Sequence, residues 1–139
     1  MPVRTLPLLL MVLLSGCSVS NLLPDGLSAD PGPEPAYRYI VATHLQGIVG
    51  DPSSSGTFEI STAKRVDAIA GASWLVCLKI QKFPLLPRYY AVFIQNDRIT
   101  DSRVSVLIDQ CEREAYTPFD WAADAAKLPA VEDFGQRRW

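Results

Sequence analysis

The chain has 139 residues, of which 48% are hydrophobic and 20% charged, and its formal net charge is -2. This length and composition suit one folded domain with a buried core and exclude a wholly disordered chain. The basic residues are scattered along the sequence. Nucleic acid is therefore not an expected partner, because binding to a phosphate backbone needs clustered Lys and Arg side chains.

The first 16 residues have the pattern of an export signal. Arg4 and the amino terminus are positive, Leu6–Leu14 is an apolar run of nine residues, and small residues follow it. Nine helical residues extend about 14 Å, roughly half the hydrocarbon thickness of a bilayer, which is too short for a membrane-spanning helix. We therefore predict that residues 1–16 form a signal peptide.

The four residues Leu14-Ser15-Gly16-Cys17 resemble the lipobox of bacterial lipoproteins. The resemblance implies cleavage before Cys17 and acylation of this residue by chains such as palmitate, so that membrane lipid becomes a partner. Two or more acyl chains anchor a protein stably. Ser18 is not the aspartate that retains many such proteins at the inner membrane, so the resemblance favours the outer membrane, facing the periplasm. The alternative is an ordinary secretory leader with a coincidental cysteine.

Residues 17–35 are predicted to be the lipidated cysteine and a flexible tether. Ser18–Pro35 contains four prolines and two glycines and has no sustained periodicity. In a polyproline-like form it extends to at most ~55 Å. The alternative is a loop packed on the domain, because the segment contains Leu22, Leu23 and Leu27.

A helix is predicted over residues 36–49. Apolar residues and one histidine recur there at helical spacing, and Gly50 followed by Asp51-Pro52 ends the pattern. We expect this apolar stripe to pack on a sheet. Its members are Tyr37, Ile40, Val41, His44, Leu45, Ile48 and Val49.

Four strands are predicted after the helix. The strand over 74–80 is apolar on both faces for part of its length, as is usual for a central strand. The segment "DAIAGAS" at 67–73 fits either a short helical turn or a connection. The other strands are expected over 57–61, 88–95 and 98–109.

Asn96-Asp97 predicts a tight hairpin turn between the last two strands. Strict pairing outward from this turn would place Asp101 and Arg103 on the face of Val92 and Ile94. We expect a β-bulge near Asp101-Ser102 to reset the alternation. Without a bulge, Asp101 and Arg103 would form a polar patch on an open face.

The sequence "TPFDWAADAAKL" predicts a second helix, with Thr117 as its cap and Pro118 in its first turn. Residues 129–139 are expected to form a tail. The predicted fold is therefore α+β. It is a single domain of residues 36–128, in which an N-terminal helix packs on a four-stranded antiparallel meander and is joined by a short C-terminal helix.

Cys77 and Cys111 remain as a pair if Cys17 is acylated. In an oxidising compartment such a pair is expected to form a disulfide. The sequence has no CxxC redox motif, and two cysteines with one histidine make a poor zinc set, so no metal is predicted.

A second resemblance covers residues 74–119, "WLVCLKI…PRYYAVFIQNDRITDSRVSVLIDQCEREAYTPF". This segment is similar to small uncharacterised lipoproteins of Gram-negative bacteria. The similarity implies a shared domain that includes a Cys77–Cys111 pairing, and it implies no activity.

No catalytic set is apparent in the sequence. His44 is the only histidine, and its place on the apolar stripe favours a residue at the edge of the core. There is no GxSxG motif beside it and no phosphate-binding glycine loop. We therefore predict a protein that is not an enzyme and has no cofactor.

Two groups of residues are candidates for binding. Phe83, Leu85 and Leu86 lie in the proline-bounded segment "FPLLP" and are the expected contact with an envelope protein partner. Trp74, Tyr89 and Tyr90 are the expected aromatic ligand face of the sheet. The predicted function is a membrane-tethered, non-enzymatic binding or adaptor domain in the cell envelope. A small-ligand-binding lipoprotein is the first alternative, and a hydrolase centred on His44 is the second.

Overall fold

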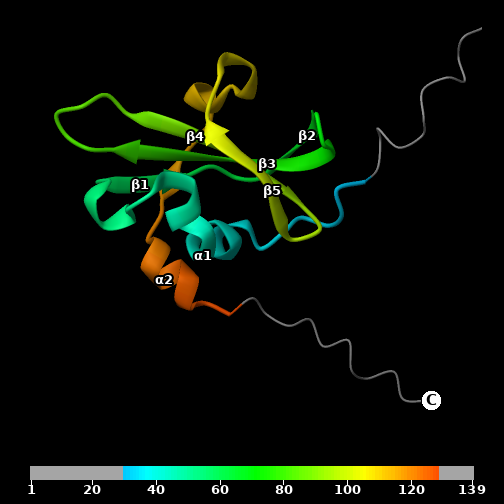
Figure 1. Cartoon of the computed structure of the whole chain (residues 1–139), viewed down its shortest axis with the longest axis horizontal. Helices are drawn as coiled ribbons and strands as arrows, with labels where there is room; N and C mark the ends of the chain where they lie inside the picture. The colour runs from blue at the N-terminus through cyan, green and yellow to red at the C-terminus, as the bar shows by residue number, and fades with distance from the viewer. Residues whose placement is uncertain (1–29, 129–139) are drawn as a thin grey trace, which may run out of the picture.

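The computed structural model describes residues 30–128 (Figure 1). The predicted signal peptide, the lipobox with Cys17, residues 17–29 of the tether and the tail after residue 128 lie outside the described residues. Among residues 30–128, no helix has the length and apolar character needed to cross a membrane.

The fold is α+β, with an antiparallel sheet of six strands in the order β5-β4-β3-β1-β6, and β2 also pairs with β3. The helix α1 lies against the sheet and α2 packs beside α1 (Figure 1). In chain order the helices and strands are α1 (Tyr37–Val49), β1 (Thr57–Ile60), β2 (Lys64–Ala68), β3 (Gly71–Gln81), β4 (Arg88–Gln95), β5 (Arg98–Val104), β6 (Thr117–Pro118) and α2 (Trp121–Ala126). Short 3-10 helices are η2 (Pro52–Ser54), η3 (Leu107–Asp109) and η4 (Cys111–Arg113).

Strand β3 is the centre of the sheet, as predicted from its two apolar faces. One of its edges pairs with β4 and the other pairs with β1 and β2. Successive side chains of a strand point to opposite faces. Val76 and Leu78 therefore lie under the helices on the "helix face", whereas Leu75 and Cys77 lie on the opposite "disulfide face".

The prediction of four strands was wrong, because β2 and β6 were missed. Strands β1 and β2 follow the same edge of β3 and are separated by a break at residues 61–63. In this break the Ser61 hydroxyl accepts a hydrogen bond from the Cys77 backbone N–H at 2.9 Å. The sequence of β2, "KRVDA", has only one large apolar residue, so its hydrophobic pattern gave no strand signal.

The C-terminal helix is shorter than predicted. Thr117 and Pro118 belong to β6, which pairs with β1. Asp120 is the actual N-cap of α2, and its side chain accepts a hydrogen bond from the Ala123 N–H at 3.0 Å. Pro118 has no N–H to donate to a ladder, which suits an edge strand as well as a helix start and explains the error.

The predicted hairpin turn and bulge are both present. Asn96 and Asp97 have φ of 48° and 59°, as a tight two-residue turn requires. Phe93 pairs with Asp101, whereas the next residue of β4 pairs with Ile99, so Thr100 is the extra residue. The bulge lies one residue earlier than expected, and it moves the side chains of Asp101 and Arg103 to the disulfide face.

Each face of the sheet has its own apolar core. On the helix face, α1 packs on alternate residues of β3 and β4, and the disulfide face holds a smaller cluster. The principal buried side chains of the helix face are Ile40, Val41, Leu45, Phe58, Ile60, Val76, Leu78, Ile80, Tyr90, Val92, Ile94 and Phe119, and those of the disulfide face are Leu75, Cys77, Ala91, Phe93 and Cys111.

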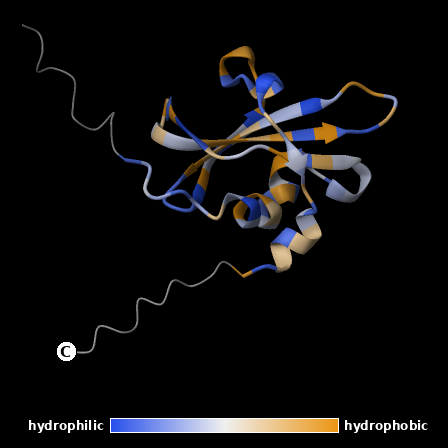
Figure 2. Ribbon diagram, turned by 180° about the vertical axis from the view of Figure 1, so that it is seen from behind, coloured by the Kyte–Doolittle hydropathy of each residue, from blue (hydrophilic) through white to orange (hydrophobic). Residues whose placement is uncertain are grey.

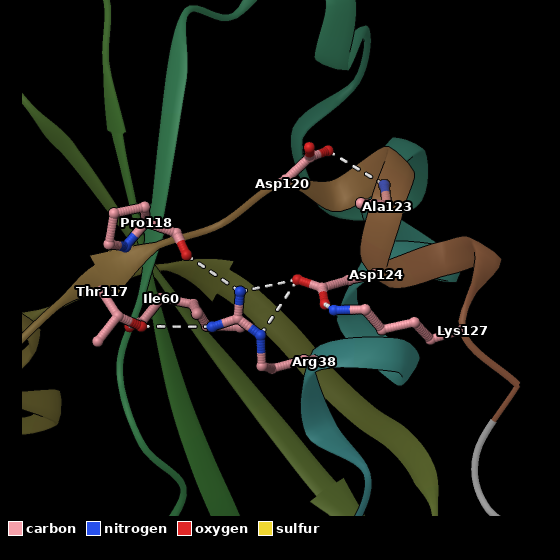
Figure 3. Close-up of polar contacts among 8 residues, drawn as sticks. All are labelled: Arg38, Ile60, Thr117, Pro118, Asp120, Ala123, Asp124 and Lys127. Carbon is pink, nitrogen blue, oxygen red and sulfur yellow. Dashed lines mark hydrogen bonds and ion pairs between the residues drawn. The ribbon is translucent and has the colours of Figure 1, made fainter.

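Arg38 joins α1 to the C-terminal part of the domain (Figure 3). Its guanidinium donates to the carboxylate of Asp124 at 2.8 Å and to the carbonyl oxygen of Pro118 at 3.0 Å, and it lies 5.3 Å from the ring centre of Phe119. The side chain of Asp124 is 5% exposed and that of Arg38 is 35% exposed. Burial by itself would raise the pKa of Asp124, but hydrogen bonds from Arg38 and Lys127 outweigh it and hold this pKa below its usual value.

Residues 30–35, which we expected within the tether, contact the domain. Asp30 pairs with Arg65 at 2.7 Å, and the carbonyl oxygen of Gly32 accepts a hydrogen bond from the Trp74 indole at 3.1 Å. The backbone N–H of Asn96 donates to the Pro31 carbonyl at 3.3 Å. These bonds fix the point where the chain meets the domain, at the β4–β5 turn and the β2–β3 end of the sheet (Figure 1).

The substitution Asp124→Asn tests the contribution of the Arg38 pair. We expect the free energy of unfolding at pH 7 to fall by about 2 kcal/mol, because a charged partner of Arg38 is lost. The pKa of Asp124 is lowered by folding, so the stabilisation is present above the unfolded value of about 3.9 and is lost as the pH falls through the folded pKa. The difference from wild type should therefore be complete at pH 7 and close in strong acid. Urea unfolding at several pH values measures it.

Glu112→Gln is the control, because Glu112 is an exposed carboxylate in η4. Its effect should stay within about 0.5 kcal/mol at every pH. A loss at Asp124 no larger than that of the control, or one equally large at all pH values, would contradict the role assigned to the pair.

Candidate functional site

An apolar pocket of about 490 Å³ lies on the disulfide face. Leu75 of β3 and Phe93 of β4 form its floor. The β2–β3 hairpin closes one side, and β5 and η3 close the other. This volume and lining are within the range of ligand and side-chain pockets in proteins. The lining residues are Val66, Asp67, Ala68, Ile69, Ala70, Leu75, Phe93, Thr100, Asp101, Arg103, Ile108 and Asp109.

One side of the pocket is polar, and Arg103 organises it. One terminal nitrogen of Arg103 donates to Asp101 at 2.7 Å and the other donates to Asp109 at 2.8 Å. The guanidinium carbon lies 4.6 Å from the ring centre of Phe93, a cation–π distance. The bulge at Thr100 is what brings Arg103 to this face, so a local backbone irregularity determines the chemistry of the pocket.

Asp109 is buried and holds η3 in place. Its carboxylate accepts from Arg103 and also from the backbone N–H of Val106 at 2.9 Å. Both oxygens of this carboxylate therefore have partners, which offsets the cost of burying the charge. The position of Ile108, which lines the pocket beside Asp109, follows from these bonds.

The predicted disulfide is present and fixes the segment after β5. Cys77 in the middle of β3 is joined to Cys111 in η4. Near it, the Tyr116 hydroxyl donates to the Cys111 carbonyl oxygen at 2.5 Å. Burial, together with the neighbouring Tyr89, raises the pKa of Tyr116 well above its usual value, so this hydroxyl keeps its proton and remains a donor. The segment after β5 is thus held at η3 by the bonds of Asp109 and at η4 by the disulfide.

Three apolar side chains near the pocket are exposed to solvent. Ile69 in the β2–β3 turn, Leu107 and Ile108 in η3 are 105%, 89% and 82% exposed. Ile69 and Ile108 line the pocket, whereas Leu107 does not. Exposed apolar groups around a concavity are typical of a binding surface.

The loop between β3 and β4 is the second exposed apolar surface. Phe83, Leu85 and Leu86 are 88%, 63% and 89% exposed, and the loop lies at the far end of the sheet from residue 30 (Figure 1). Figure 2 shows apolar colour both on this loop and on the segment that carries η3. Hydrogen bonds from Leu85 N–H to the Lys82 carbonyl oxygen at 2.8 Å and from Gln81 to the Leu85 carbonyl oxygen at 2.7 Å brace the loop.

The expected aromatic ligand face is not one surface. Trp74 and Tyr90 belong to the helix face, where Tyr90 is buried and the Trp74 indole donates to Gly32. Tyr89 lies on the disulfide face, with its ring 6.0 Å from that of Tyr116. The alternation of β4 separates Tyr89 from Tyr90, so adjacent aromatics in a strand could not share a face. None of the three lines the 490 Å³ pocket.

His44 is exposed on α1, away from the core edge where we expected it. Its Nδ1 lies 2.9 Å from the Ile40 carbonyl oxygen and 3.1 Å from the Thr43 hydroxyl. In residues 30–128 no carboxylate forms an ion pair with His44, and no group of three or more potential metal ligands occurs. The local geometry places no acid–base pair around this histidine.

Comparisons of the chain with protein-family models, curated proteins and solved structures find no match.

The sequence reasoning missed the pocket. It placed residues 98–109 in one strand, whereas β5 ends at Val104 and Leu107–Asp109 form η3. The signal that was available is the cysteine pair, because a segment tied to the middle of β3 through Cys111 must cross the face of the sheet. Ile69 belongs to residues 67–73, which were expected to form either a short helical turn or a connection, whereas the structure places it in the turn between β2 and β3.

Removal of the disulfide by Cys77→Ala/Cys111→Ala should lower the free energy of unfolding by about 3–4 kcal/mol, because the bond closes a loop of 34 residues. Urea unfolding of the full chain measures this change. Wild-type protein kept in reductant should unfold at the same urea concentration as the variant. Equal stability of wild type and variant without reductant would show that the bond does not hold the segment.

Proposed function

We propose that this chain is a lipid-anchored, non-enzymatic binding domain of the cell envelope. Its acylated Cys17 would sit in the membrane, by the lipobox resemblance at the periplasmic face of the outer membrane, and the domain would bind an envelope protein. The observation that carries the proposal is the exposure of Phe83, Leu85 and Leu86 on one protruding loop. Burying such side chains against a partner yields about 1.5–3 kcal/mol each.

The position of the loop supports a contact directed away from the anchor. The chain leading from Cys17 joins the domain at Asp30, which is held by Arg65. Strand β3 begins at that end of the sheet and extends for eleven residues, from Gly71 to Gln81, before the loop starts. At about 3.3 Å per residue this is roughly 33 Å. The domain would thus act as a spacer between the anchored end and the contact.

Small-ligand binding is the second candidate function, and the 490 Å³ pocket favours it. The residues concerned differ from those expected in the sequence, because Leu75 and Phe93 form the floor in place of Trp74, Tyr89 and Tyr90. A hydrolase centred on His44 gains no support, because the partners of its Nδ1 are a carbonyl oxygen and a hydroxyl.

Cys17→Ala tests the anchor. The wild-type chain should partition into the detergent phase on phase separation, whereas the variant should keep its unprocessed leader and carry no acyl chain. Mass spectrometry of the amino-terminal peptide distinguishes the two forms. Wild-type protein with an unmodified Cys17 sulfur, recovered from the soluble cell interior, would overturn the proposed location.

The double substitution Leu85→Ser/Leu86→Ser tests the contact. Crosslinking in intact cells followed by pull-down should recover a protein partner with wild type and at least about a hundredfold less of it with the variant, since two apolar side chains are lost from the interface. Leu128→Ser is the matched control, because Leu128 is 85% exposed but lies far along the chain from the loop. An identical set of partners for wild type and loop variant would remove the loop from the proposal.

A further inference from the structure

The pocket on the disulfide face is acidic as well as apolar. Its lining residues include three carboxylates, Asp67, Asp101 and Asp109, and one guanidinium, that of Arg103, which leaves a net charge of -2. Both terminal nitrogens of Arg103 are already bonded to carboxylates of the pocket. A group that enters the pocket therefore meets apolar walls and an excess of negative charge.

The β3–β4 loop has the complementary character. Three exposed apolar side chains form its tip, and Lys82 and Arg88 flank them, with no acidic residue between these two positions. Both flanking cations are exposed. The loop protrudes and carries apolar groups and positive charge, whereas the pocket is concave and carries apolar groups and negative charge. Complementary potentials favour association and fix its register.

The sizes also agree. A cavity of ~150 Å³ holds one benzene molecule, and the pocket, at about 490 Å³, has roughly three times that volume. It is large enough for the ring of Phe83 together with a leucine side chain. Ile69 and Ile108 stand exposed on the walls and would be covered by such an insertion.

The loop cannot reach the pocket of its own chain. The pocket lies at the β2–β3 end of the sheet and extends along β3 as far as Leu75, whereas the loop follows Gln81, the last residue of this strand. Six residues of β3, roughly 20 Å, separate Leu75 from the start of the loop. A contact between these two surfaces therefore requires two molecules.

We propose that the partner of the loop is a second copy of this chain, whose disulfide-face pocket receives Phe83, Leu85 and Leu86. This inference rests on the proposed function, because it names the partner of the same loop. The contact uses different surfaces on the two copies, so each copy in a pair keeps one unused loop or pocket. Such head-to-tail contacts extend into rows of molecules unless their rotation closes a ring.

Co-capture of two differently tagged full-length copies, after crosslinking in intact cells, tests the proposal. The loop variant is Leu85→Ser/Leu86→Ser, and the pocket variant is Ile69→Ser/Ile108→Ser. All four side chains are exposed, so both variants should match wild type in urea unfolding. Leu107→Ser is the matched control for the pocket, because Leu107 is equally exposed, adjoins Ile108 and does not line the pocket.

Two wild-type copies, or two copies of the Leu107→Ser control, should be captured together. Two loop-variant copies or two pocket-variant copies should be captured at least about a hundredfold less, from the loss of two buried apolar side chains. One loop-variant copy paired with one pocket-variant copy should recover capture, since one intact loop still meets one intact pocket. This restoration is specific to a contact between unlike surfaces.

Other results overturn the inference. Capture that neither variant weakens would exclude the loop and the pocket as the contact between copies. Loss of capture in the mixed pair would indicate that both surfaces act on the same side of an interface, not as complements. If no copies are captured together but the loop variant still loses a crosslinked protein of another kind, this inference fails and the proposed function stands. If wild type gives no crosslinked partner of any kind, both this inference and the proposed function fail.

Discussion

The bond between Cys77 and Cys111 is the constraint on which the second face of this sheet depends. It connects the centre of the central strand to a segment that has little regular structure of its own, since η3 and η4 are each three residues long. Such short helices have no independent stability. With the bond in place, Cys77, Ala91 and Cys111 are almost completely buried, and the chain after β5 is carried across the sheet. Without it, the apolar residues Leu75 and Phe93 would form an open sheet surface, with no wall at Ile108.

The bulge at Thr100 is the second feature, after the disulfide, on which the pocket depends. An uninterrupted ladder would direct Asp101 and Arg103 toward the helix face, where α1 and the buried side chains of β4 leave no room for an ion pair. One extra residue turns both side chains to the disulfide face. There Arg103 lies over Phe93 and reaches the buried carboxylate of Asp109. The covalent bond and the ion pair then hold the same segment from two sides, and the pocket between them acquires one polar wall.

Local patterns in the sequence predicted much of the central sheet. The alternation of Trp74–Ile80, the Asn96-Asp97 turn and the cysteine pair are each specified by neighbouring residues or by residue type, and all three agree with the structure. Strand β2 and the short β6 could not be predicted in this way. Both are edge segments with few apolar residues, and they are strands because β1 and β3 offer them unpaired backbone groups. The helix α2 begins later than its proline suggested because β6 takes that proline into the sheet.

The candidate site was less predictable than the fold, because its residues come from four separate segments and become neighbours only through the bulge and the disulfide. Side chains that looked similar in the sequence ended on different faces, as Tyr89 and Tyr90 did. Apolar residues in the irregular segments, such as Ile69 and Ile108, carried no periodic signal, yet these are the ones that remain exposed beside a hollow. Apolar residues at periodic positions in strands and helices are buried in the fold, whereas Ile69 and Ile108 remain on the surface.

Both apolar cores of the domain form without Ile69 and Ile108, so these two side chains are available for contact with another molecule. They lie at the end of β3 opposite the other exposed apolar group, the β3–β4 loop. The two apolar surfaces of one molecule are complementary but too far apart to contact each other. Contact between two copies is therefore the simplest arrangement that would bury both.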